Sequence, residues 1–283
     1  MIVIADSGST KTIWAKVETG ERFVTQGLNP LFASDSVFTS TCTNVRHKFH
    51  IKSPNLSVYF YGAGCSGRDR LKRVKEVISS VFQTDKVVIE SDLLGACRAV
   101  SAGKASMVGI LGTGSNACLF SGSKIGAHPT STGYILGDKG SANHVGRILL
   151  NGYLVGSMPE ELRRMFHDDY PMKDCKFMDA VYRKPYPNRF LASLAPFATK
   201  HLDDDYCRSV VERSLNEWFD ECLLPLWRKK TVNNMKVHIV GGYAKSIEPL
   251  LRSVLSNRGL FVTTVVADPM DGLLDYYRDS KNS

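Results

Sequence analysis

Near its start the chain carries the stretch Asp6-Ser7-Gly8-Ser9-Thr10-Lys11-Thr12, a turn of small residues between the β-rich segments Ile2–Ala5 and Thr12–Val17. Glycine and serine let backbone N–H groups approach an anion closely, and a nest of such groups binds phosphate. A tight hairpin, in which the polar side chains bond only their own backbone, is the other interpretation. The stretch is not a P-loop, which needs Gly-Lys-Ser/Thr entering a helix, and it lacks the three spaced glycines of a dinucleotide fingerprint.

A second turn of the same kind, Leu111-Gly112-Thr113-Gly114-Ser115-Asn116, follows another β-rich segment. It too can be explained as a simple hairpin. Two such turns in related halves of a chain could instead clamp the phosphates of one nucleotide. Only the first turn carries a carboxylate, and Asp6 could hold a hydrated magnesium ion, which takes few carboxylates and keeps several waters.

The segments around the two turns repeat the order βββαβα, which predicts a sheet with helices packed against it in each half. In the first half the expected elements are strands at Ile2–Ala5, Thr12–Val17 and Phe23–Gln26, a helix over about 34–47, a strand at Ser57–Tyr61, a basic helix, a strand at Lys86–Glu90 and a helix from Ser91-Asp92. In the second half they are strands at Ser106–Leu111, Ala117–Phe120 and Lys124–Gly126, and a helix from Gly140-Ser141-Ala142 to about Leu154.

The remainder of the second half is expected to contain a helical insertion over about 158–230. Its clearest helix carries an apolar stripe from Cys207 to Leu226 at 3.6-residue spacing, started by Asp203-Asp204-Asp205. A strand at Lys236–Val240, a helix at Tyr243–Ser256, a strand at Phe261–Val266 and a helix from Asp271 complete the pattern. We therefore expect two domains, 1–104 and 105–283, and the last helix could pack back on the first.

Composition excludes several classes of protein. With 283 residues, 43% hydrophobic and 23% charged, the chain can build a substantial core. No apolar stretch approaches the ~18 residues of a membrane span, and Met1-Ile2-Val3-Ile4 does not resemble an export signal. Seven cysteines without a Cys-x-x-Cys pair indicate reduced thiols and a cytoplasmic location.

The net charge of +8 raises the question of nucleic-acid binding. The densest basic stretch, Arg68–Lys75, has apolar residues at helical spacing, so the solvated face of an amphipathic helix explains it. We therefore expect neither nucleic acid nor a membrane as a partner.

Three further motifs follow predicted strands: Ser91-Asp92, Gly137-Asp138-Lys139-Gly140-Ser141-Ala142 and Val240-Gly241-Gly242. Helix capping alone could explain the two aspartates. The glycine pair either permits a turn or lets an adenosine lie against bare backbone.

Together with Gly27-Leu28-Asn29, these motifs resemble those of the N-acetylglucosamine kinase family, within the actin-like superfamily of sugar kinases, heat-shock chaperones and actin. They stand in family order from residue 6 to residue 242. The resemblance implies an α/β fold with duplicated RNase H-like (actin-like ATPase) domains, each with a βββαβα core, facing across a nucleotide cleft.

The resemblance also implies roles for individual residues. Asp6 would orient Mg²⁺, and Asp92 would accept the proton of the sugar 6-hydroxyl. The residues expected around the ATP phosphates are Gly8, Ser9, Thr10, Lys11, Gly112, Thr113, Gly114 and Ser115. Gly241 and Gly242 would contact adenosine. Asn29 and Asp138 would bind sugar hydroxyls, and Ser115 is also assigned to the sugar.

The chain departs from the family at two places, the second of which borders the sugar pocket. Lys139 stands where the family usually has glutamate, and Pro129-Thr130-Ser131-Thr132-Gly133 replaces a Gly-Gly-Trp-Gly stretch. Phosphate transfer from ATP is therefore better determined than the identity of the sugar.

The leading hypothesis is a magnesium- and ATP-dependent sugar kinase of amino-sugar metabolism that makes N-acetylglucosamine 6-phosphate or a related product. Its expected partner is a small-molecule sugar, with a homodimer left open. One alternative is an ATPase activator of 2-hydroxyacyl-CoA dehydratases, which holds an iron–sulfur cluster between subunits; Cys65 is the one loop cysteine in a suggestive setting. The other is a non-catalytic sugar sensor, against which the presence of Asp6, Asp92 and Asp138 argues.

Overall fold

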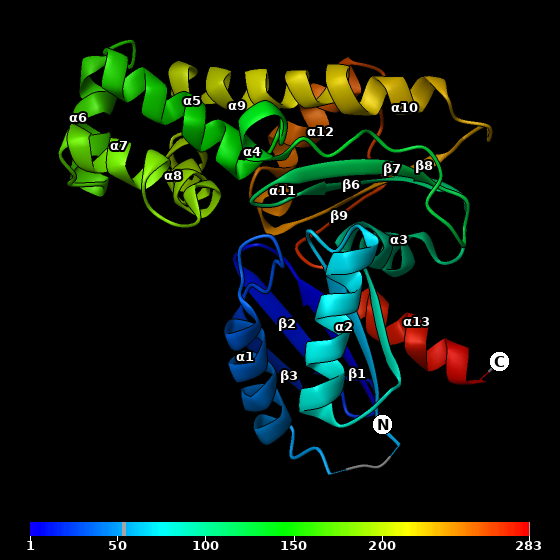
Figure 1. Ribbon diagram of the computed structural model, residues 1–283. Coiled ribbons are helices and arrows are strands. Elements are labelled where there is room, and N and C mark those ends of the chain that lie inside the picture. The colour runs from blue at the N-terminus through cyan, green and yellow to red at the C-terminus, as the bar shows by residue number, and fades with distance from the viewer. Residues whose placement is uncertain (53–54, 283) are drawn as a thin grey trace. The chain divides into compact units, whose positions relative to one another are not determined.

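A computed structural model of the chain describes residues 1–52 and 55–282 (Figure 1). The chain forms two compact units. The first unit contains Met1–Lys104, Phe120–Ile125 and Asp268–Ser283, and the second contains Ala105–Leu119 and Gly126–Ala267. Within the described ranges, no helix is both long and apolar enough to cross a membrane.

The first unit is built on a five-stranded sheet of order β3-β2-β1-β4-β5. Its strands are β1 (Ile2–Ser7), β2 (Lys11–Lys16), β3 (Arg22–Gln26), β4 (Ser57–Gly62) and β5 (Val87–Ser91). The first three form an antiparallel meander, whereas β4 pairs parallel with both β1 and β5. The register places Asp6 beside Ile13 of β2 and Tyr61 of β4, at the carboxyl end of the central strand.

Helices cover both faces of this sheet, because successive side chains of a strand point to opposite sides. On one face, Val3 and Ala5 pack in a cluster with α1 (Asp35–Lys48) and α2 (Arg68–Phe82). On the other face, Ile4 packs with residues of α13 (Met270–Asn282). This last helix lies along α3 (Asp92–Ser101) so closely that a Cβ on Gly272 would come within 2.1 Å of the Ala99 carbonyl oxygen.

The second unit contains a four-stranded sheet of order β7-β6-β8-β9. Its strands are β6 (Ser106–Leu111), β7 (Ser115–Phe120), β8 (Lys236–Val240) and β9 (Thr264–Val266), with β6, β8 and β9 parallel. Its helical segments are α4 (Gly133–Leu136), α5 (Ala142–Val155), α6 (Glu160–Asp169), α7 (Asp174–Tyr182), α8 (Pro187–Lys200), α9 (Asp205–Trp218), the π-helical turn η1 (Phe219–Leu223), α10 (Leu224–Arg228), α11 (Gly242–Ser246) and α12 (Glu248–Asn257).

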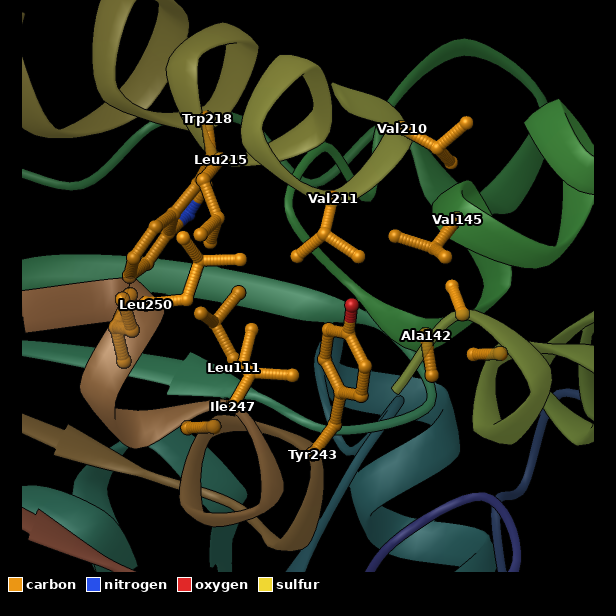
Figure 2. Close-up of a cluster of buried hydrophobic side chains, with 14 of the residues drawn as sticks. Leu111, Ala142, Val145, Val210, Val211, Leu215, Trp218, Tyr243, Ile247 and Leu250 are labelled. Carbon is orange, nitrogen blue, oxygen red and sulfur yellow. The ribbon is translucent and has the colours of Figure 1, made fainter. Parts of the chain in front are cut away.

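The apolar stripe expected from Cys207 onward forms the core of this unit. Val211, Leu215 and Trp218 of α9 are buried. Figure 2 shows them above Leu111 of β6 and Ile247, which lies between α11 and α12. Asp204 begins α9 as its N-cap, accepting hydrogen bonds from the backbone N–H groups of the first turn.

Four sequence-based expectations in the second half of the chain were wrong in detail. Residues 124–126 form only an isolated bridge between Ile125 and Phe120, and the strand expected from Phe261 begins at Thr264. The single helix expected over 243–256 is α11 followed by α12, because Pro249 in the first turn of α12 cannot continue a helix from the preceding turn. The stripe that ends at Leu226 is interrupted by the wider turn η1.

Candidate active site

The first turn is a β-hairpin whose base is fixed by side-chain hydroxyls. The Gly8 N–H donates to the Lys11 carbonyl (3.0 Å), and Ser7 Oγ lies 2.8 Å from Thr12 Oγ1. Ser7 Oγ also accepts from the Leu28 N–H (3.1 Å), which ties the turn to the segment after β3. The turn is therefore a hairpin, but its side chains do not bond only their own backbone, because Ser7 also contacts Thr12 and Leu28. Phosphate binding by this turn stays a prediction.

The segment Gly27-Leu28-Asn29 lies directly against the turn. A Cβ on Gly27 would come within 2.4 Å of the Ser9 carbonyl oxygen, so only glycine allows this approach. Asn29 is buried, with 5% of its surface exposed, and its Nδ2 lies 3.5 Å from Ser9 Oγ. Its Oδ1 accepts from the Leu31 N–H (2.9 Å). Asn29 is thus held next to the turn by contacts on both ends of its amide.

Gly64 limits the space around Asn29 from the loop after β4. Its φ is +75°, and a Cβ at this position would lie 2.3 Å from Asn29 Oδ1. The structure therefore brings Asn29, the first turn and the loop after β4 together, although they are far apart in the sequence.

The carboxylates of Asp92 and Asp268 act on that of Asp6 at this end of the sheet. Asp92 is the first residue of α3 and accepts from its neighbour, the Leu93 N–H (2.9 Å). Asp268 precedes α13 and accepts from the Met270 N–H (3.0 Å). Burial, reinforced by the negative charges of Asp92 and Asp268 and opposed by Lys11, raises the pKa of Asp6 to about 7.

Sequence reasoning singled out Asp6 and Asp92 and missed Asp268. Asp268 precedes a proline and a helical pattern, which is a recognisable capping signal. That signal predicts where a helix starts. It does not predict that the Asp268 carboxylate acts on Asp6, at the end of β1.

The electrostatics of Asp6 fit a hydrated divalent cation. A carboxyl with a raised pKa is one whose negative charge lacks compensation, and a nearby cation would supply it. Across the described ranges, no three His, Cys, Asp or Glu side chains form a protein-only metal cage. Magnesium does not require one, because it is usually held by one or two carboxylates together with phosphate oxygens and waters.

The second turn is bound to the loop that carries Asp138. The Ser115 N–H donates to Asp138 Oδ1 (3.3 Å), and Ser115 Oγ donates to the Lys139 carbonyl (2.7 Å). Asn143 Nδ2 bridges the two segments, donating to Asp138 Oδ2 (2.9 Å) and to the Thr113 carbonyl (2.6 Å). The predicted residues Thr113, Ser115 and Asp138 therefore lie together.

Sequence reasoning missed Asn143 because it lies in the first turn of a regular helix, α5, where an asparagine gives no signal of a binding site. It is completely buried in the structure. Its role is visible only once the second turn and the Asp138 loop are in place around it.

Asp138 is held in a constrained position. Its φ is +53°, in the left-handed region, and burial raises the pKa of its carboxyl against the opposing effects of Asn143, the Ser115 N–H and Arg147. An ionised carboxylate has about four acceptor positions, so two hydrogen bonds leave capacity for a further donor. The side chain could therefore accept from a ligand hydroxyl.

Gly241 approaches the second turn from the end of β8. Its φ is +143°, and a Cβ there would lie 2.0 Å from the Leu111 carbonyl oxygen and 3.2 Å from the Gly112 nitrogen. Gly242 follows as the first residue of α11. The backbone of Gly241 can therefore lie against the backbone of the second turn only because residue 241 has no side chain.

Comparison with solved structures first defines the class of fold. The chain matches MreB5 of Spiroplasma citri bound to AMPPNP with a TM-score of 0.61 and 10% identity, over 99% of this chain and 96% of that chain. The expected α/β fold with duplicated actin-like domains is confirmed.

A closer match then identifies the family. A protein from Porphyromonas gingivalis, described as a putative N-acetylglucosamine kinase, is 37% identical with a TM-score of 0.91, over 99% of this chain and 100% of that chain. One of the same description from Chromobacterium violaceum has a TM-score of 0.76 and 15% identity, over 97% and 98% of the two chains. No family model and no curated protein matches. The chain belongs to the N-acetylglucosamine kinase family of the actin-like ATPase and sugar kinase superfamily, as its motifs indicated.

Proposed function

We propose that this carbohydrate kinase transfers the γ-phosphoryl group of ATP to the 6-hydroxyl of N-acetylglucosamine or a related amino sugar. The observation that carries the proposal is the full-length relative, 37% identical, that is described as a putative N-acetylglucosamine kinase. A role in amino-sugar metabolism follows from that substrate. The seven free cysteines support a cytoplasmic location.

Asp6 would hold Mg²⁺ together with the phosphates of ATP. When bound, Mg²⁺ supplies charge neutralisation to the phosphate oxygens. The first turn would lie against the phosphates through Gly8, Ser9, Thr10 and Lys11. Because the Gly8 N–H is already donated to Lys11, we expect the donors to be other groups of the turn, including the Lys11 ammonium.

In the second unit, Gly112, Thr113 and Gly114 would contribute backbone to the phosphates, and Gly241 with Gly242 would lie against adenosine. A Cβ on Gly114 would come within 2.9 Å of Asp138 Oδ2, so this turn has no room for a larger residue. Tight, preformed turns suit phosphoryl transfer, which asks a protein mainly for positioning and charge stabilisation.

Asp92 would act as the base that accepts the proton of the attacking sugar hydroxyl. Its carboxylate is oriented by the Leu93 N–H, and the preceding Ser91 side chain caps α3 by accepting from the Leu94 N–H (3.2 Å). A base on a rigid helix start can be held within hydrogen-bond distance of its target. Asn29, Asp138 and Ser115 would bind the other sugar groups.

The activator alternative is disfavoured by the setting of Cys65. This residue is buried, with 4% of its surface exposed, and burial, reinforced by Asp92, raises the pKa of its thiol to about 12. An iron–sulfur ligand must be a thiolate, so a thiol that resists ionisation beside a carboxylate suits a packing role better.

The proposed function is tested by ATP consumption in the presence of amino sugars, N-acetyl sugars and neutral hexoses. We expect sugar-dependent ADP release that is greatest with an N-acetyl or amino sugar, and a product whose phosphate NMR signal couples to the protons on C6. Asp92→Asn, measured in parallel, controls for contaminating kinases. ATP turnover that is independent of every sugar would refute the proposal. A preference for neutral hexoses would refute the amino-sugar substrate and leave a hexose kinase.

A further inference from the structure

We propose that Lys139 and Glu217 form a positioning ion pair that holds Asp138 in its ligand-binding geometry. The inference rests on the proposed role of Asp138 as a sugar-binding residue. Neither Lys139 nor Glu217 is expected to touch the substrate, so both would act through the loop that contains Asp138.

The loop needs an anchor because its backbone is in an unfavourable conformation. Asp138 carries a Cβ and has a φ of +53°, whereas the φ of +78° at Gly140 is one that glycine adopts freely. Left-handed conformations are disfavoured for residues that carry a Cβ, and they persist when surrounding contacts hold them. The hydrogen bonds of Asp138 to Ser115 and Asn143 hold one end of the loop.

Lys139 provides the contact at the other end. Its Nζ donates to Glu217 Oε2 at 2.7 Å and lies 3.7 Å from Glu221 Oε1. The side chains of Lys139 and Glu217 are only 19% and 25% exposed, so solvent and salt screen this pair less than a surface pair. The ammonium group of Lys139 therefore lies between two carboxylates, Glu217 of α9 and Glu221 of η1.

Glu217 also has contacts with residues other than Lys139. Its Oε1 accepts from Arg213 Nε (3.0 Å), one turn earlier on α9, and His144 Nε2 lies 3.5 Å from its Oε2. Hydrogen bonds from Lys139 and Arg213 outweigh burial and lower the pKa of the Glu217 carboxyl. Little conformational freedom is therefore lost when Lys139 binds it.

The next residue on α9 packs against the next residue of the loop. A Cβ on Gly140 would lie 2.7 Å from Trp218 Cβ, and Trp218 is completely buried in the core of the second unit. Immediately beyond Trp218 the helix widens into η1, which carries Glu221. Glu217 and Trp218 of α9 thus contact Lys139 and Gly140 of the loop, respectively. Widened helical turns such as η1 are frequent near functional sites.

The consequence is specific to sugar binding. If the pair is removed, Asp138 keeps its own hydrogen bonds but the loop around it can relax. A residue that positions a binding group affects ground state and transition state alike, so KM for the sugar should rise while kcat changes little. The lysine would thus tune affinity for the sugar without taking part in the chemistry.

The test uses the full chain with Lys139→Met, Glu217→Gln and the double variant, and with Lys139→Arg as the conservative replacement. Lys200→Met is the matched control, since Lys200 lies 3.5 Å from Asp169 in a more exposed pair of the same unit. Steady-state kinetics with N-acetylglucosamine are measured at saturating ATP. Amide hydrogen exchange of residues 137–144 is followed in parallel.

We expect each single variant to raise KM for the sugar about tenfold, a typical effect for a charge-assisted hydrogen bond, with kcat within about threefold. The double variant should be no worse than the singles, Lys139→Arg should stay near wild type, and Lys200→Met should change nothing. Exchange of 137–144 should be faster in Lys139→Met.

An unchanged KM in Lys139→Met, a loss confined to kcat, or additive effects in the double variant would overturn the inference while leaving the kinase proposal intact. If the wild-type protein phosphorylates no sugar, the proposed function fails. Hydrogen exchange then tests independently whether the ion pair holds the loop. Unchanged exchange of residues 137–144 in both Lys139→Met and Glu217→Gln would refute this role.

Discussion

The raised pKa of Asp6 makes the stability of the metal-free protein depend on pH. A carboxyl that binds its proton more tightly when folded stabilises the folded state fully below its unfolded pKa. That stabilisation is lost as pH rises, because the unfolded chain releases the proton first. For Asp6 the window runs from its ordinary pKa near 4 up to about 7, where the folded protein also ionises.

The magnitude follows from the width of that window. A difference of roughly 3 pH units, at 1.36 kcal/mol for each, corresponds to a loss of roughly 4 kcal/mol by the time Asp6 is fully ionised. Asp6→Asn keeps the shape of the side chain and removes its charge. The advantage of this variant in free energy of unfolding should therefore grow by roughly 3 kcal/mol between pH 5 and pH 8.5, since the upper two-thirds of the window lies there.

The assay is urea unfolding in the presence of a chelator at several pH values, with Asp69→Asn, an exposed aspartate of α2, as the control. The same Asp6→Asn variant should lose sugar phosphorylation at any magnesium concentration, because the proposed metal site loses its carboxylate. The reasoning would be refuted if the difference in stability between Asp6→Asn and the wild type were constant with pH. It would also be refuted if Asp6→Asn were the less stable protein at pH 8.5, because the charge of Asp6 would then be compensated in the folded state.

Three further predictions concern other residues. Asp268→Asn should lower the pKa of Asp6, seen as a downward shift of its carboxyl carbon titration in NMR; no shift would mean that the two charges do not interact. Asp92→Asn should turn over at least ~100-fold more slowly with nearly normal binding of ATP and sugar, whereas Asp138→Asn should mainly raise KM for the sugar; the reverse pattern would exchange their roles. Cys65→Ser should keep most phosphotransfer, because the thiol is buried and resists ionisation, and the protein should contain no stoichiometric iron or zinc by metal analysis; stoichiometric iron would revive the activator hypothesis.

Much of the fold was predictable because its elements are specified locally. The basic segment 68–82 alternates charged and apolar residues at helical spacing, and it is the helix α2. Each glycine-rich turn follows an apolar strand at the place where a nest can form, and both turns lie at the ends of β1 and β6 as expected. The single helix expected over 243–256 overlooked a local signal, because Pro249 separates α11 from α12.

The family, the two turns and the candidate residues could be read from the sequence, since motif order and hydrophobic period are properties of neighbouring residues. Which distant groups meet them became visible only in the folded chain. Asp268 influences Asp6 because α13 returns to the first sheet, and Glu217 reaches Lys139 because α9 packs over the second turn's loop. Such contacts depend on how helices pack against sheets, and burial and charge at each site are set there, far from the residue's own neighbours in the chain.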